Sequence, residues 1–146
     1  MNSSGGRATP SLLYAVKRLE LVIRAHLDEV LRGSGITTPQ YTALTVLAHR
    51  DGVSAAQLAR SSFVTPQAMA DMLRTLEERG LIQRTPNPDS RRERLVRITT
   101  DGRRLLRDYA DAVDAIEDRM IAGLTRAKSD AFRQALTVMW QALRPG

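Results

Sequence analysis

Residues 89–94 constrain the fold more than any other segment, because they place three arginines between two strand-like runs. Leu81 and Ile82 form the first run, directly after a helical pattern that ends at Gly80. The second run, residues 95–99, is rich in β-branched side chains. Two such runs around a polar turn predict a β-hairpin directly after a helix. Residues 84–97 contain five arginines and two acids, so this hairpin should carry a local net charge of +3 (5 − 2).

Three threonine–proline pairs precede helical patterns and predict where helices begin. They are Thr9-Pro10, Thr38-Pro39 and Thr65-Pro66. A threonine hydroxyl can cap free backbone N–H groups, and proline is tolerated in the first helical turn, where its missing N–H is not needed. A fourth pair, Thr85-Pro86, is followed closely by Pro88, and two prolines so near each other forbid a helix. We therefore expect a loop at that pair.

Long amphipathic helices are predicted at both ends of the chain. A first helix is expected at about residues 10–32, and residues 33–35 should end it. Its apolar stripe is wide enough to contact more than one neighbour, which favours a dimer interface. A second long helix should start at Thr99 or Thr100, and a last helix should follow a break at residues 123–125 and end before Pro145. The first stripe contains Leu12, Val16, Leu19, Ile23, Leu27 and Val30.

The middle of the chain has the proportions of a helix-turn-helix. A helix at residues 39–49 should stop at Asp51-Gly52, and Ser54 should cap the short helix that follows. A turn at residues 61–64 separates that short helix from a longer one, which begins at Thr65-Pro66 and stops at Gly80. A short helix, a tight turn and a longer helix are typical of this motif. The residues predicted to face the core of the longer helix are Met69, Met72, Leu73 and Leu76.

Composition narrows the class of protein. With 146 residues, 42% hydrophobic and 26% charged, the chain fits one folded domain. The net charge is +6 and 20 of the 22 basic residues are arginine, which favours a polyanionic partner such as nucleic acid. No cysteine is present, and two distant histidines do not make a metal site, so we expect no metal or cofactor. No nucleophile–base pair or phosphate-binding glycine loop indicates an enzyme.

Targeting signals are not evident. The chain has no apolar run near 18 residues and no apolar signal-peptide core in residues 1–8. We expect a cytoplasmic protein without a membrane partner, and a mobile N-terminal tail.

Four ordered motifs resemble the MarR family of bacterial transcription regulators, over about residues 10–144. Residues 38–44 (TPQYTAL) resemble the start of the family's second helix, and residues 54–59 (SAAQLA) its entry into the helix-turn-helix. Residues 76–82 (LEERGLI) resemble the junction between recognition helix and wing. Residues 89–99 (DSRRERLVRIT), followed by Asp101-Gly102, resemble the wing signature and the start of the next helix.

The resemblance implies a mainly α fold with a small β-hairpin (α+β), that is, a winged helix-turn-helix with N- and C-terminal dimerisation helices. Residues 1–9 would form a flexible tail, residues 10–36 and 100–146 the dimerisation helices, and residues 37–99 the DNA-binding lobe. It further implies a homodimer that binds a palindromic operator in double-stranded DNA, usually to repress transcription. Many members release DNA when a small, often aromatic, acid binds between the dimerisation helices and the lobe.

The same resemblance, with the chemistry of the side chains, assigns roles at the DNA. Gln67 is the best candidate to read a base, because its amide can pair with an adenine edge. Arg91 would enter the minor groove, with Asp89 orienting it. Asp71 departs from the family pattern, in which a basic or neutral polar residue is more common at this position. A carboxylate is repelled by DNA unless Arg74 pairs with it or it accepts from a cytosine amino group. The expected DNA-binding residues are Ser54, Thr65, Pro66, Gln67, Ala68, Asp71, Arg74, Asp89, Arg91, Arg92 and Arg94.

Alternative interpretations stay open at three places. Ser54 and Thr65 are also explained by helix capping alone, which we expect to be their main role. Arg92 and Arg94 would either contact phosphates or hold the loop. The candidates for a small-molecule effector site, each also explained by a core or surface role, are Tyr14, His26, Tyr41, His49 and Tyr109. A second hypothesis is a winged-helix module that binds protein instead of DNA, supported by Asp71 and the featureless Ala68 and Ala70.

Overall fold

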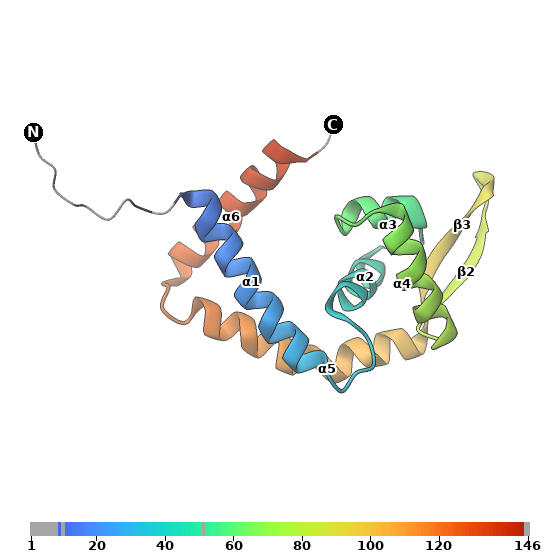
Figure 1. The fold of residues 1–146 in the computed structure, drawn as a ribbon, viewed down its shortest axis with the longest axis horizontal. Helices are drawn as coiled ribbons and strands as arrows, with labels where there is room; N and C mark the ends of the chain where they lie inside the picture. Colours follow the sequence, from blue (N-terminus) through green and yellow to red (C-terminus); the bar gives the residue numbers. More distant parts are fainter. Residues whose placement is uncertain (1–8, 10, 51, 145–146) are drawn as a thin grey trace, which may run out of the picture.

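The computed structural model describes residues 9, 11–50 and 52–144. The expectations for the tail at residues 1–8, for Pro10, for Asp51 and for Pro145 lie outside the described residues. Helices and strands follow each other as in Figure 1. In chain order they are α1 (Leu12–Leu31), α2 (Thr38–His49), β1 (Val53–Ser54), α3 (Ala55–Ser61), α4 (Pro66–Glu78), β2 (Ile82–Asn87), β3 (Ser90–Ile98), α5 (Thr100–Ile121) and α6 (Arg126–Leu143).

The chain divides into a lobe and a set of long helices. Figure 1 shows α2, α3, α4 and the β-hairpin gathered on one side, while α1, α5 and α6 extend to the other. The core lies in the lobe, where Leu44, Leu58, Met69 and Leu73 have no exposed side-chain surface. Burial of each such side chain stabilises the fold by about 1.5–3 kcal/mol. These contacts fix α4 against the rest of the lobe, and the inward positions expected for α4 are confirmed.

Helix caps are partly where the sequence predicts them. Ser54 and Thr65 cap α3 and α4 as expected. For α2 the expectation was off by one residue: Thr37 is the cap, and Thr38 and Pro39 lie inside the helix. Thr37 is the cap instead of Thr38 because Gln40 forms a reciprocal capping box with Thr37. The cap of α1 is Ser11, whose Oγ accepts from the Tyr14 N–H at 3.1 Å, and the expectation of Thr9 was wrong.

The wing is longer than the sequence predicts. β2 and β3 pair antiparallel from Ile82 opposite Ile98 to Pro86 opposite Arg94. The register then shifts, so that Asn87 pairs with Ser90 and residues 91–93 have no cross-strand partner, and only residues 88–89 lie between the two strands. The expected loop at Thr85-Pro86 is therefore wrong, because Thr85 pairs with Leu95 and Pro86 with Arg94. Proline is tolerated there because β2 lies at the edge of the sheet, whose order is β1-β3-β2, so its missing N–H is not needed by another strand.

β1 was not expected, because its two residues are too few to show a strand pattern. Val53 pairs with Val96 and Ser54 with Leu95. The strand ties the start of α3 to the wing, so the helix-turn-helix and the wing share one sheet.

The long helices keep their apolar side chains largely uncovered. Within the described residues, α6 has no buried side chain and α1 has only Leu31. The exposed fraction reaches 70% at Leu12 and 84% at Leu143. Across the part of the chain that is described, no helix is long and apolar enough to cross a membrane.

Candidate nucleic-acid interface

One face of α4 is polar and exposed, while the opposite face packs in the core. Met69, Leu73 and Leu76 are fully buried. Helical periodicity then turns the other side chains of the helix outward. The exposed residues near its N-terminus are Pro66, Gln67, Ala68, Asp71 and Arg74.

The two cap residues differ in what they leave free. Ser54 is only 4% exposed, and its Oγ accepts from the Gln57 N–H at 3.2 Å. Capping is thus its role in this structure, and a phosphate contact by Ser54 stays a prediction. Thr65 is exposed, and its Oγ1 accepts from the Ala68 N–H at 3.1 Å. The N-terminus of α4 is consequently open to an anion such as a DNA phosphate.

Asp71 is bracketed by its neighbours on the outer face of α4. Its Oδ1 accepts from Nε2 of Gln67 at 3.3 Å and lies 3.4 Å from the guanidinium of Arg74. Exposed ion pairs of this kind add little stability. They do place a positive charge beside the carboxylate, which offsets part of its repulsion of DNA. The pairing of Arg74 with Asp71 that the sequence suggested does form.

Arg91, Arg92 and Arg94 lie on strand β3 and not in the turn, and Arg91 and Arg92 belong to its stretch without a cross-strand partner. Asn87 holds the turn by accepting from the Asp89 N–H at 2.9 Å. Ser90 Oγ accepts from the backbone N–H groups of Arg92 and Glu93, each at 3.3 Å. Over the described part of the chain, Arg91 has no side-chain hydrogen bond or ion pair, with Asp89 or with any other residue. The support of Arg91 by Asp89 therefore stays a prediction for the DNA-bound state.

Three other arginines of this segment brace the wing. Arg94 donates to the backbone carbonyl of Arg84 across the hairpin at 3.1 Å. Nε of Arg84 lies 3.5 Å from Oε2 of Glu77, which connects the wing to the end of α4. Arg97 donates from Nε to Oγ1 of Thr85 at 3.2 Å. Arg94 thus holds the wing, as one of its two expected roles requires.

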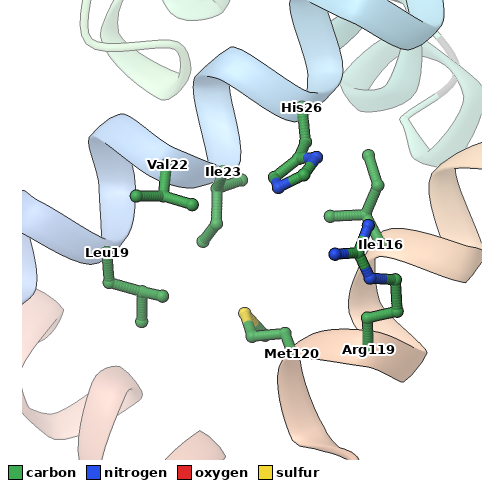
Figure 2. A pocket seen from close by; sticks show the side chains of 7 residues that line it. All are labelled: Leu19, Val22, Ile23, His26, Ile116, Arg119 and Met120. Atoms are coloured by element: carbon green, nitrogen blue, oxygen red, sulfur yellow. The ribbon is translucent and has the colours of Figure 1, made fainter.

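An apolar cavity with two basic side chains lies between α1 and α5. Its volume is about 230 Å³. Figure 2 shows His26 from α1 and Arg119 from α5 facing the same space. Arg119 was not anticipated, because a single charged residue in an exposed helical pattern gives no signal. The remaining lining residues are Leu19, Val22, Ile23, Ile116 and Met120.

The other candidates for an effector site do not gather around this cavity. Tyr14 lines a separate depression along α1, and Tyr109 lines another beside Gly33. His49 is exposed at the end of α2. Tyr41 is half-buried on α2; desolvation raises its pKa above 10.0, and the nearby Asp114 carboxylate adds to the shift. His26 shares its cavity with Arg119, while the depressions of Tyr14 and Tyr109 contain Arg18 and Arg104.

Known proteins match this arrangement in sequence and in fold. The model of the MarR family matches residues 36–93, which cover the lobe and most of the wing. The HTH-type transcriptional repressor Rv2887 of Mycobacterium tuberculosis is 34% identical over 123 residues, or 84% of this chain and 88% of that protein. The crystal structure of CouR from Rhodococcus jostii RHA1, bound to p-coumaroyl-CoA, is 25% identical, with a TM-score of 0.81 over 94% of this chain and 95% of CouR.

A further solved structure agrees. A MarR-family transcriptional regulator from Rhodococcus sp. RHA1 is 26% identical, with a TM-score of 0.78 over 90% of this chain and 96% of that chain. The winged helix-turn-helix, the basic wing and these relatives lead to one conclusion: the chain belongs to the MarR family of transcriptional regulators, a family of regulators and not of enzymes.

Proposed function

We propose that the chain is a dimeric, cytoplasmic repressor that reads a palindromic operator and is released by a small acid. The observation that supports DNA binding is that, in the wing as the structure describes it, some arginines have partners within the protein while others are free to contact DNA. Arg84, Arg94 and Arg97 brace the wing, while within the described residues the guanidinium groups of Arg91 and Arg92 on β3 make no hydrogen bond or ion pair. The repressor named among the relatives supports repression as the outcome.

The N-terminus of α4 would enter the major groove. Gln67 is the residue proposed to read a base there, since its amide can pair with the N6 and N7 of adenine. Asp71 accepts one amide N–H of Gln67 and so favours one orientation of that amide. Arg91 would lie in the flanking minor groove, where a narrow A·T-rich tract attracts a guanidinium. Thr65 and Pro66 would bring the helix N-terminus to a phosphate.

A second copy of the chain is proposed to cover the apolar surface of the long helices. Soluble monomers rarely expose contiguous apolar surface beyond a few hundred Å². Among the described residues, the exposed large apolar side chains other than Phe63 lie within residues 12–22 and 120–143, on α1, the end of α5, the turn after it and α6. A self-complementary contact between these helices in two copies would bury them and hold two recognition helices at a fixed spacing.

The cavity between α1 and α5 is the proposed effector site. The guanidinium of Arg119 can bind a carboxylate through two parallel hydrogen bonds, and His26 can donate a further one. The five apolar lining residues suit an aromatic or aliphatic body of modest size, given a volume of about 230 Å³. CouR, bound to an aromatic acyl thioester, supports an effector of related chemistry.

Selection of genomic fragments by the purified protein tests the proposal. Sedimentation should give twice the chain mass of 16.2 kDa, and a selected fragment should contain a two-fold symmetric site. Benzoate or salicylate should then lower the affinity for that fragment, while Arg119→Gln should bind the same fragment and resist the acid. A monomer without fragment enrichment would overturn the function. Equal release of wild type and Arg119→Gln would overturn only the effector site.

The alternative of a protein-binding module is favoured by one observation, the bland and acidic part of α4 around Ala68 and Asp71. Retention on heparin with a steep salt dependence separates the two functions, because only the DNA-binding protein replaces condensed counterions. Binding to a protein partner that does not respond to salt would favour the module.

A further inference from the structure

The turn of the helix-turn-helix places an aromatic residue where glycine is the usual choice. α3 ends in a Schellman motif, in which the Val64 N–H bonds to the carbonyl of Ala59 at 3.1 Å and the Phe63 N–H to that of Arg60 at 3.4 Å. This motif requires a left-handed residue after the cap, and Phe63 adopts φ of 55° to supply it. A bulky side chain rarely occurs in this conformation, which is costly without a compensating contact.

That compensating contact is made to a distant helix. The ring of Phe63 meets the ring of Trp140 on α6 edge to face, with centroids 6.4 Å apart and an angle of 86° between the planes. This geometry is the favourable one for two aromatic rings. The guanidinium of Arg144 also lies 5.6 Å from the centroid of Trp140. Phe63 is still 66% exposed, so burial alone does not explain a phenylalanine at this position.

The contact connects two parts of the fold that are otherwise joined at their opposite ends. Figure 1 shows the C-terminal end of α6 reaching toward the α3 side of the lobe, while α5 and the link from α1 to α2 connect the two parts elsewhere. Phe63 and Trp140 also line one cavity of about 540 Å³, whose other walls come from the start of α1 and the end of α6. The turn of the helix-turn-helix thus touches the C-terminal helix.

We propose that Phe63 is a positioning residue for operator binding: its contact with Trp140 fixes the lobe, and with it α4, relative to the long helices. The inference rests on the proposed function. A dimer that reads two half-sites needs its recognition helices about 34–36 Å apart, one DNA turn. A lobe anchored at one end only can pivot about that end. A second anchor, three residues before α4 begins at Pro66, removes that freedom.

The choice of variants separates positioning from stability. Phe63→Gly supplies the residue that the turn prefers, so its melting temperature should equal or exceed that of the wild type, while the aromatic contact is lost. Phe63→Tyr keeps the ring and serves as the matched control. Trp140 is the single tryptophan of the chain, so its fluorescence reports the contact directly.

The experiment compares these variants on a genomic fragment selected by the wild type. In Phe63→Gly, Trp140 emission should move to longer wavelength. The Kd for the DNA fragment should rise about 2- to 12-fold, which is the free energy of one aromatic pair converted into a change of affinity. This variant should also discriminate less against the same fragment with one base pair inserted between its half-sites. Phe63→Tyr should resemble the wild type in all three measurements, and Trp140→Leu should weaken binding as Phe63→Gly does.

Three results would overturn the inference. They are wild-type affinity and spacing preference in Phe63→Gly, a Phe63→Tyr as weak as Phe63→Gly, or a Phe63→Gly that fails to fold. Sedimentation of Trp140→Leu shows whether it remains a dimer; if it does not, Phe63→Gly decides. If the wild type itself enriches no fragment, the proposed function fails instead, and the emission of Trp140 in Phe63→Gly still tests the contact.

Discussion

Alanine at Gly102 should destabilise the protein, although glycine is normally the worse residue in a helix. Gly102 lies in the first turn of α5, where alanine is favoured over glycine by up to about 1 kcal/mol in the absence of other contacts. A Cβ there would lie 2.3 Å from the carbonyl oxygen of Leu81 and 2.7 Å from Cγ1 of Ile98. Reaching even 3.0 Å from that oxygen requires a movement of 0.7 Å (3.0 − 2.3).

The Leu81 carbonyl has little freedom to move away, because it accepts from the Thr99 N–H at 3.1 Å. The clash therefore falls on the junction where the wing meets α5. Overpacking of a tight site costs about 1–3 kcal/mol, and a fixed backbone neighbour puts this site at the upper end. After the gain in helix propensity, we expect Gly102→Ala to lower the free energy of unfolding by about 2 kcal/mol.

Two other glycines serve as controls for backbone conformation and for space. Gly80 has φ of 73°, and no atom lies within 4 Å of the position that an alanine Cβ would take, so Gly80→Ala should cost about 1–2 kcal/mol from conformation alone. Gly123 has neither constraint, so Gly123→Ala should stay within about 0.5 kcal/mol of the wild type. Urea denaturation at one protein concentration, which keeps any dimer contribution equal, measures all three. A Gly102→Ala variant as stable as Gly123→Ala would refute the reasoning.

Further predictions concern the wing, a cap and a tyrosine. Arg91→Ala should weaken binding to a selected fragment by about 1–3 kcal/mol in an anisotropy titration, whereas Arg133→Ala, which removes the same charge from α6, should have little effect. Thr65→Ala should lower the free energy of unfolding by about 1 kcal/mol in urea, because the Ala68 N–H loses its partner. The raised pKa of Tyr41 favours its neutral form in the folded state. The neutral form of Tyr41 therefore contributes its full stability to the fold below about pH 10, and this stability is lost as the pH rises further. Between about pH 8 and about pH 10.5, the free energy of unfolding should fall more in the wild type than in Tyr41→Phe.

Local patterns were enough to predict the helices and the inward face of α4. Met69, Leu73 and Leu76 recur at helical spacing, and that spacing alone determines which side of the helix can be buried. Ser54 and Thr65 were also predictable as caps, because a cap side chain bonds only to backbone groups in the first turn of its own helix.

Features that depend on packing between distant segments could not be predicted in this way. From the sequence alone Pro86 indicates a loop, and only the order of the strands shows that it lies on an edge strand. The two-residue strand at Val53 is defined only by its pairing with β3. Periodicity likewise says that His26 and Arg119 lie on helices, but not that those helices bring them to one cavity. The left-handed conformation of Phe63 could not be predicted from the sequence, because the residue that usually indicates this conformation at a helix end is glycine.

The salt dependence of binding to a selected genomic fragment tests the central claim most directly. A protein that places α4 and the arginine wing on DNA replaces several condensed counterions, so the logarithm of its affinity should fall steeply with the logarithm of salt concentration. Each phosphate contact contributes about −0.9 to that slope. For the wild type we expect a slope of several times this value, one for each phosphate that the protein contacts. A slope near zero, with binding intact, would contradict recognition of DNA by this surface.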